Sequence, residues 1–203
     1  MKKYLFTLFL LVGFHTYQSA QEIEKLALSI GVIAPDFNLK GVDGKMHSLA
    51  NVKNAKGYLV IFTCNHCPFS QAYEDRIIAI HKKFAIKGVP VIAINPNDGD
   101  REPEDNFENM VKRAKVHHYP FNYLVDNDQN TAKAYGAKRT PHVFLLNAQR
   151  KLIYTGAIDD NFEEAKDVKI KYLENAIQLF LAGKPILTPS TKAIGCGIKW
   201  KKY

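Results

Sequence analysis

The stretch Tyr-Leu-Val-Ile-Phe-Thr-Cys-Asn-His-Cys-Pro, residues 58–68, decides the fold. Its first five residues form an apolar run without alternation, which is typical of a strand buried on both faces of a sheet. Two cysteines in C-x-x-C spacing follow that strand directly. From Ser70 to Lys87 apolar side chains recur every three or four positions, which predicts an amphipathic helix. The stretch therefore predicts a buried strand, a loop with two cysteines and a helix.

Strands and helices continue to alternate along the rest of the chain. The order predicts an α/β fold in which a mixed sheet is flanked by helices. Because neither an internal repeat nor a linker-like stretch interrupts residues 21–203, we expect one domain there. The further elements expected are a hairpin over residues 36–49, a strand over 89–94, a helix over 107–114, a strand over 123–125, a helix over 131–135 that ends at Gly136, a hairpin over 143–155 and a last helix over about 165–182.

The composition is that of a soluble globular protein rather than a disordered or membrane protein. Of the 203 residues, 46% are hydrophobic and 24% are charged, and the formal net charge is +8. The basic residues are spread along the chain and form no stripe interleaved with aromatic side chains. Nucleic-acid binding is therefore not expected.

The first 20 residues have the pattern of a secretory signal peptide. Lys2 and Lys3 precede an apolar run of 11 residues, Tyr4 to Phe14, and polar residues then lead to Ala20. A membrane-spanning helix needs about 20 apolar residues, so no stable membrane anchor is expected. The sequence predicts export to the periplasm or another extracytoplasmic compartment, with cleavage near Ala20.

Cys64 and Cys67 are the candidate redox pair of this exported chain. If the helix begins just after Thr63, Cys64 lies in its first turn, where free N–H groups and the helix dipole stabilise a thiolate. His66 is expected to lower the pKa of Cys64 further, by charge or by a ring N–H donated to sulfur. Cys67, three residues on, is close enough to join Cys64 in a disulfide and to resolve a mixed disulfide.

The alternative reading of the two cysteines is half of a tetrahedral zinc site. Such a site usually shows a second close-spaced pair of ligands, which this sequence lacks. Free zinc ligands on an exported chain would also tend to oxidise, so redox chemistry is favoured and no metal or organic cofactor is expected. The residues considered for completing a zinc site are Cys196, His81, His117, His118 and His142.

Two groups of motifs carry a resemblance to a known family. Residues 62–68, followed much later by Thr140-Pro141 before a strand, resemble the active-site loop and the facing cis-proline of the thioredoxin superfamily. Residues 31–37 with Asp43-Gly44-Lys45 look like the opening hairpin of its redoxin branch, which includes peroxiredoxins and the thioredoxins of cytochrome c maturation. The resemblance implies a thioredoxin-like mixed sheet with an N-terminal β-hairpin and a helix–strand insertion over residues 96–126.

The resemblance also implies an activity and a substrate site. It implies a thiol–disulfide oxidoreductase in which Cys64 and Cys67 are catalytic and whose partners are protein thiols or disulfides, with an upstream thiol donor. Pro141 is implied to be cis and to lie against the disulfide, and the exposed carbonyl and amide of Thr140 to pair with a substrate backbone. His66 and Thr63, which replaces the usual Trp, are the candidate redox-tuning residues.

Departures from the family keep a second activity as the alternative. A thiol peroxidase of peroxiredoxin-like type would reduce a hydroperoxide, but its P-x-x-x-T-x-x-C pattern requires threonine where Ile61 stands. Cys196, in a Gly-Cys-Gly tail, is a candidate resolving cysteine, and His142 is a candidate tuning residue. The acidic run at Asp98, Asp100, Glu102 and Glu104 is interpreted as surface charge.

Overall fold

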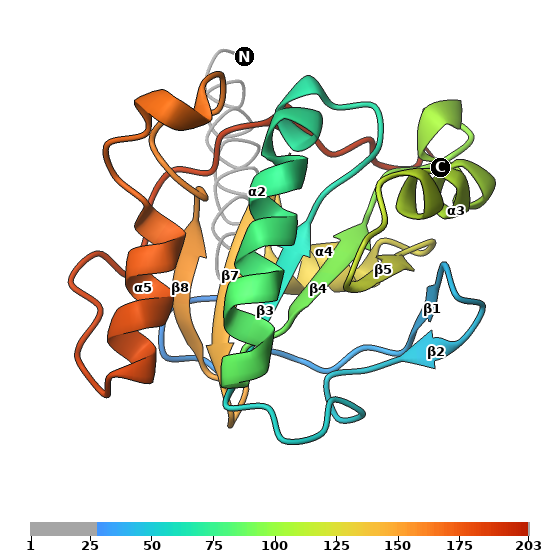
Figure 1. Ribbon diagram of the computed structural model, residues 1–203. Helices are drawn as coiled ribbons and strands as arrows, with labels where there is room; N and C mark the ends of the chain where they lie inside the picture. Colours follow the sequence, from blue (N-terminus) through green and yellow to red (C-terminus); the bar gives the residue numbers. More distant parts are fainter. Residues whose placement is uncertain (1–27, 203) are drawn as a thin grey trace, which may run out of the picture.

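A computed structural model describes residues 28–202 and contains a seven-stranded mixed sheet with helices on both faces (Figure 1). The strand order is β2-β1-β5-β4-β3-β7-β8, and β6 and β9 form a separate two-stranded pair. The strands are β1 Leu39–Gly41, β2 Met46–His47, β3 Gly57–Phe62, β4 Val91–Asn95, β5 Asn122–Val125, β6 Arg139–Thr140, β7 His142–Asn147, β8 Leu152–Gly156 and β9 Cys196–Gly197. The α-helices are α2 Pro68–Phe84, α3 Phe107–Val116, α4 Asn130–Tyr135 and α5 Tyr172–Leu181.

The expected fold class is confirmed by the pairing of the strands. The central strand β3 runs parallel to β4 and antiparallel to β7, and all six of its residues are buried. The expected hairpin is β1 with β2, and β1 also pairs antiparallel with β5. Residues 96–126, which contain α3 and β5, form the expected helix–strand insertion.

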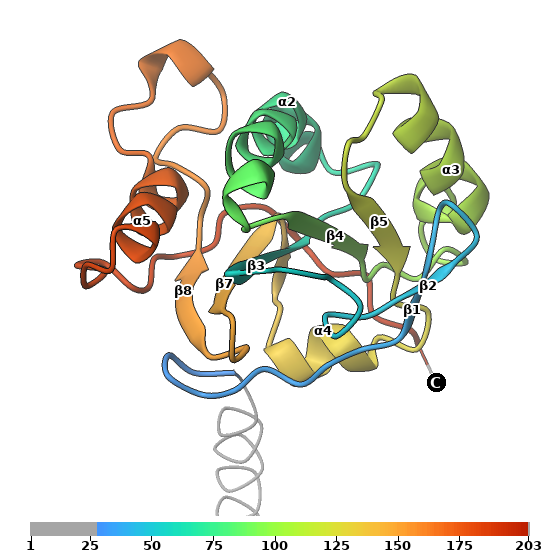
Figure 2. The same ribbon diagram turned by 60° about the horizontal axis from the view of Figure 1, so that its bottom comes forward.

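The two faces of the sheet are covered by different helices. Because side chains alternate along a strand, Leu59 and Ile61 of β3 pack with α2 and α5, whereas Val60 and Phe62 pack on the face that carries α4. Figure 2 shows α2, α3 and α5 on one side of the sheet and α4 on the other. Gly136 adopts a left-handed conformation with φ +68° directly after α4, as its place at the end of the expected helix requires.

Two helix starts differ clearly from the expected ones, and one strand was not expected. Helix α2 begins at Pro68 and not after Thr63, because proline is favourable in a first turn and the preceding residues form a loop. Residues 165–167 form only a short 3₁₀ helix, so α5 begins at Tyr172. The C-terminal tail, which has no sequence periodicity, contributes β9.

The predicted signal peptide falls within residues 1–27, outside the described residues, and stays a prediction. Within residues 28–202, no helix combines the length and the apolar character that a membrane span requires.

Candidate active site

The two cysteines of the pair lie in the loop between β3 and α2 and meet the same residue across the site. Cys64 Sγ lies 3.2 Å from Thr140 Oγ1, and Cys67 Sγ lies 3.1 Å from the carbonyl oxygen of Thr140. The Thr140–Pro141 peptide bond is cis, as the resemblance implied. Both cysteines are free thiols in this structure, and their exposed fractions are 4% for Cys64 and 0% for Cys67.

The helix N-terminus lies at Cys67 rather than at Cys64. Cys67 is the N-cap residue of α2, with extended backbone, and its carbonyl accepts the N–H of Gln71. The unpaired N–H groups of the first turn therefore lie next to Cys67. The expectation that Cys64 lies in the first turn of the helix is wrong, because the N-cap is Cys67, three residues later.

A buried carboxylate, Asp105, organises the loop between the two cysteines. Its Oδ1 accepts the backbone N–H groups of Asn65 at 2.6 Å and of His66 at 3.1 Å. Its Oδ2 accepts His66 Nδ1 at 2.5 Å and Asn97 Nδ2 at 2.6 Å. The carboxylate is 1% exposed, and these four donors use its four lone-pair positions. Asp105 therefore fixes the main chain between Cys64 and Cys67.

The ring of His66 is turned toward carboxylates. Nδ1 lies 3.7 Å from Cys64 Sγ but only 2.5 Å from Asp105, and Nε2 lies 3.6 Å from Glu102 Oε2. The N–H that was expected to stabilise the Cys64 thiolate is thus donated to Asp105. The expected lowering of the pKa of Cys64 is wrong. The hydrogen bond with Cys67, burial and the charge of Asp105 all raise that pKa.

The pKa values of the two thiols of the pair shift in opposite directions. The pKa of Cys67 is lowered mainly by its hydrogen bond with Cys64, whereas the same contact is the largest cause of the raised pKa of Cys64. A thiolate that accepts an S–H from its neighbour is stabilised, and the donating thiol becomes harder to ionise. Removing the first proton from the pair is therefore easy, and removing the second is hard.

Thr63 and Thr140 are placed differently from their expected roles. Thr63 is buried, and its backbone N–H donates to the carbonyl of Ile94. Among the described residues, no hydrogen bond joins its side chain to either sulfur. Thr140 was expected to be exposed, but its exposed fraction is 0%, because β9 pairs with β6 and sets Cys196 opposite Thr140.

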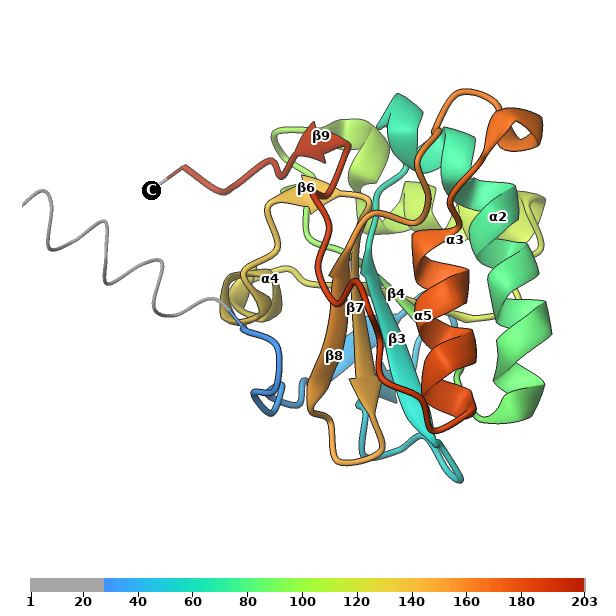
Figure 3. The ribbon, with the colours of Figure 1, turned by 90° about the vertical axis from the view of Figure 1, so that its left-hand side faces the viewer.

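The third cysteine comes to the pair from the far end of the chain. Cys196 Sγ lies 2.6 Å from Cys67 Sγ, and Cys196 is only partly buried. Figure 3 shows β9 beside β6, above the end of β7. The three cysteines therefore form one cluster with Cys67 in contact with both others.

The metal-binding alternative has a different set of residues from the expected one. Among residues 28–202, one group of three candidate ligand atoms lies within 4.8 Å of one another, and it consists of Cys64, His66 and Asp105. The Asp105 oxygens and His66 Nδ1 are already engaged with each other and with N–H donors. His81 and His117 are held elsewhere, by Val91 and Glu74. These contacts disfavour a zinc site.

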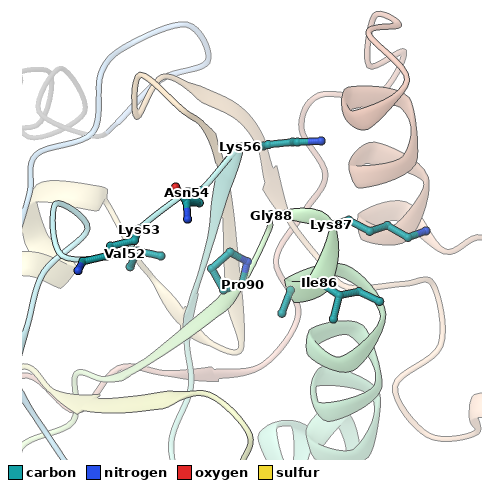
Figure 4. Close-up of a pocket in the computed structure, with 10 residues that line it drawn as sticks. Val52, Lys53, Asn54, Lys56, Ile86, Lys87, Gly88 and Pro90 are labelled. Atoms are coloured by element: carbon teal, nitrogen blue, oxygen red, sulfur yellow. The ribbon is translucent and has the colours of Figure 1, made fainter.

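A surface pocket of about 430 Å³ lies at the other end of β3 from the cysteines. It is lined by residues of the loop before β3 and of the turn after α2, and Figure 4 shows Lys53, Lys56 and Lys87 around it. None of its ten lining residues is a cysteine, histidine or acidic residue. The reactive groups and this pocket are therefore separate.

His142 directly follows the cis-proline, but its side chain contacts residues other than the cysteines. Its Nδ1 accepts the N–H of Lys138 at 3.3 Å, its Nε2 lies 3.3 Å from Thr155 Oγ1, and its ring packs on Phe144. These contacts do not include a sulfur, so the tuning role considered for it is not supported. Burial is the main cause that lowers the pKa of His142 to about 4.

The low pKa of His142 predicts a loss of stability in acid. The unfolded chain binds this proton below about pH 6.5 and the folded chain only below about pH 4, so folding weakens as the pH falls through that window. The shift corresponds to about 3 kcal/mol. Between pH 7 and pH 4.5, the urea midpoint of His142→Asn, which keeps an acceptor for the N–H of Lys138, should fall less than that of wild type. The exposed control His118→Asn should show the same fall as wild type. Equal acid losses in all three would contradict this assignment.

Sequence reasoning missed several residues that surround the pair. Asp105 directly follows the acidic run that was interpreted as surface charge, and nothing in the local sequence distinguishes it. Ser70, one turn into α2, places its hydroxyl 3.9 Å from Cys64 Sγ. Tyr123 of β5 donates its hydroxyl to Asn65 Oδ1 at 2.9 Å. The inserted segment thus supplies contacts that hold the C-x-x-C loop.

A C-x-x-C pair at the end of a central strand, facing a cis-proline across the same sheet, defines a protein of the thioredoxin-like class. Residues 30–155 match the AhpC/TSA family, and the chain belongs to that family. It is 30% identical over 140 residues to the thiol-disulfide oxidoreductase ResA of Geobacillus thermodenitrificans, covering 66% of this chain and 74% of that protein. This likeness supports a redox enzyme in general.

Two solved structures resemble the fold over most of its length. A hypothetical protein from Sinorhizobium meliloti is 36% identical, with a TM-score of 0.82, over 87% of this chain and 97% of that one. An uncharacterized conserved protein from Geobacillus kaustophilus is also 36% identical, with a TM-score of 0.82, over 87% and 94% of the two chains. Neither protein is named for an activity.

Proposed function

We propose that this chain is an exported thiol–disulfide oxidoreductase that exchanges disulfides with proteins through Cys64 and Cys67. The observation that carries the proposal is the contact of both sulfurs with Thr140, next to the cis-proline. The likeness to a thiol–disulfide oxidoreductase supports the same activity. Export is supported by the signal-peptide pattern of residues 1–20.

In the proposed mechanism a proton passes from Cys64 to Cys67, which allows Cys64 to act as the nucleophile. Of the two residues, Cys64 is 4% exposed, whereas Cys67 is 0% exposed. When a substrate disulfide approaches, Cys67 accepts the proton of Cys64. The Cys64 thiolate then attacks one substrate sulfur, the substrate S–S bond breaks, and the other substrate sulfur leaves as a thiolate.

The second step closes the enzyme disulfide. The departing substrate thiolate takes the proton now on Cys67, and the Cys67 thiolate attacks Cys64 Sγ in the mixed disulfide. The Cys64–Cys67 bond forms, the mixed disulfide breaks, and the second substrate sulfur leaves as a thiol after protonation by solvent. The substrate gains two electrons and the enzyme loses two, which an upstream dithiol donor restores.

A thiol peroxidase is the second candidate, and membership of the AhpC/TSA family is the observation that favours it. A hydroperoxide would then oxidise Cys64 to a sulfenic acid, which a second thiol converts to a disulfide with loss of water. The missing threonine three residues before Cys64 counts against it. Disulfide exchange is therefore the first candidate.

The exchange mechanism predicts a trapped complex when Cys67 is removed. Reduced Cys67→Ser protein, mixed with insulin and quenched with an alkylating agent, should retain an insulin chain on Cys64, at least about tenfold more than wild type, because the resolving thiolate is absent. A non-reducing gel followed by peptide mass spectrometry measures the complex and its linkage.

Two further variants make this trap decisive. Cys64→Ser/Cys67→Ser should hold no insulin, and Cys67→Ser/Cys196→Ser should hold at least as much as Cys67→Ser, since it also lacks the tail thiol. An insulin complex that forms on Cys64→Ser and not on Cys67→Ser would show that Cys67 is the attacking residue. That result would contradict the proposed order of steps.

A further inference from the structure

The C-terminal tail occupies the edge at which the resemblance places a substrate backbone. Strand β9 pairs antiparallel with β6, with Cys196 opposite Thr140 and Gly197 opposite Arg139. Arg139 Nη1 also donates to the carbonyl of Gly195 at 2.9 Å. The chain thus presents its own extended Gly-Cys-Gly segment to the cis-proline loop, in the manner of a bound peptide.

Glycine at position 195 is needed for this approach. A Cβ built on Gly195 would lie 2.2 Å from the carbonyl oxygen of Thr140, far inside contact distance. A Cβ on Gly197 would meet no atom within 4 Å. The tail therefore lies directly on the Thr140 backbone at one glycine and is unobstructed at the other.

Several contacts beyond the cysteine hold the tail in place. Ile198 is 7% exposed and belongs to the core on the α4 face of the sheet. The N–H of Lys199 donates to Asn97 Oδ1 at 2.9 Å, and its carbonyl accepts the N–H of Asp98 at 3.0 Å. Asn97 also donates to Asp105, so the tail and the C-x-x-C loop share one hydrogen-bond network. The position of Cys196 is thus built into the fold.

We propose that Cys196 is a third redox cysteine and that the tail is a tethered substrate whose sulfur exchanges with the Cys64–Cys67 disulfide at Cys67. The proposal deepens the proposed function and rests on the formation of that disulfide. Its geometric basis is the 2.6 Å separation of Cys67 Sγ and Cys196 Sγ, about half an ångström more than a disulfide bond of about 2.05 Å.

The exchange needs no outside oxidant. The Cys196 thiolate attacks Cys67 Sγ, the Cys67–Cys196 bond forms, the Cys64–Cys67 bond breaks, and Cys64 leaves as a thiolate that takes the proton Cys196 has lost. One disulfide is present before and after. In the product the tail is covalently locked over the Thr140 edge, and the oxidised bond lies at the partly exposed Cys196, where a donor thiol reaches it.

Peptide mapping of oxidised protein tests this exchange. After equilibration in glutathione buffers and alkylation, trypsin leaves Cys64 and Cys67 together in residues 57–76 and Cys196 in residues 193–199. Wild type should give both a 64–67 bond and a cross-link between the two peptides that carries an alkylated Cys64. The Cys64→Ser variant should form the cross-link within one monomer and lose both of its thiols, and Cys196→Ser should form only the 64–67 bond.

The outcome separates this proposal from the proposed function. If Cys64→Ser keeps two free thiols across the glutathione series, or links only between monomers, the tethered-substrate proposal is overturned, while insulin reduction by wild type would still stand. If wild type gives both the 64–67 bond and the cross-link within the monomer, the proposal holds even where wild type fails to reduce insulin.

A glycine pair supplies the matched control for tail position. Gly195→Ala should lift the tail from Thr140 and lower the yield of the 67–196 link at least about tenfold relative to the 64–67 bond, because a disulfide tolerates little displacement of its ends. Gly197→Ala, in the same two-strand pair, should give the wild-type ratio. Equal ratios in the two variants would overturn the assigned role of the tail.

Discussion

Replacing Cys64 by serine is expected to lower dithiothreitol-driven insulin reduction by at least about 100-fold, because the thiolate is the nucleophile and a serine hydroxyl does not replace it. Of the two remaining thiols, Cys67 is fully buried, and burial with the Cys67 contact raises the pKa of Cys196 to about 11. Neither thiol is therefore expected to attack the disulfide of another protein at neutral pH, whereas exchange within the chain is favoured by the 2.6 Å separation of Cys67 Sγ and Cys196 Sγ. The insulin turbidity assay at pH 7 measures the rate.

The control for this variant is its fold. Serine keeps a donor and an acceptor for Thr140 Oγ1, 3.2 Å from the Cys64 sulfur, so the unfolding midpoint in urea should stay close to wild type. The double variant Cys64→Ser/Cys196→Ser should remove any residual rate, because the tail thiol is then absent. A rate within a factor of three of wild type for Cys64→Ser would show that Cys64 is not the nucleophile.

The parts of the fold that sequence predicted are those with a local cause. The apolar run before the cysteines predicts β3, and the amphipathic pattern after them predicts α2. In both cases the residue types themselves indicate which positions are buried. The start of α2 was misplaced although Pro68 carried the signal, since a proline favoured at the first helical position makes Cys67 the N-cap.

The parts that sequence did not predict depend on distant contacts. Asp105 follows four acidic residues of similar appearance, and only packing across 40 positions of chain brings it to the N–H groups of Asn65 and His66. Strand β9 has only two residues and no hydrophobic periodicity, so the sequence pattern does not predict its pairing with the strand that contains Thr140. The expected effect of His66 on Cys64 failed for the same reason, because the acceptor that turns the ring away was not identified.

Asp105→Asn is expected to make the protein both less stable and more oxidising. The amide keeps the shape of the side chain but turns an NH₂ group toward donors that the carboxylate now accepts, which leaves buried N–H groups without partners. The cost is about 2–4 kcal/mol in the free energy of unfolding. Urea denaturation of the reduced protein measures this effect.

The potential distinguishes a positioning role from a merely structural one. The charge of Asp105 is one cause of the raised pKa of Cys64, so its removal stabilises the thiolate and hence the reduced pair. A gain of one pKa unit corresponds to about 1.4 kcal/mol, or an upward shift of about 30 mV in the reduction potential measured against a glutathione series. Glu104→Gln, which removes an exposed carboxylate from the neighbouring position, should leave both stability and potential near wild type. A destabilised Asp105→Asn with an unchanged potential would restrict Asp105 to holding the loop, and the charge that keeps Cys64 protonated would have to come from elsewhere.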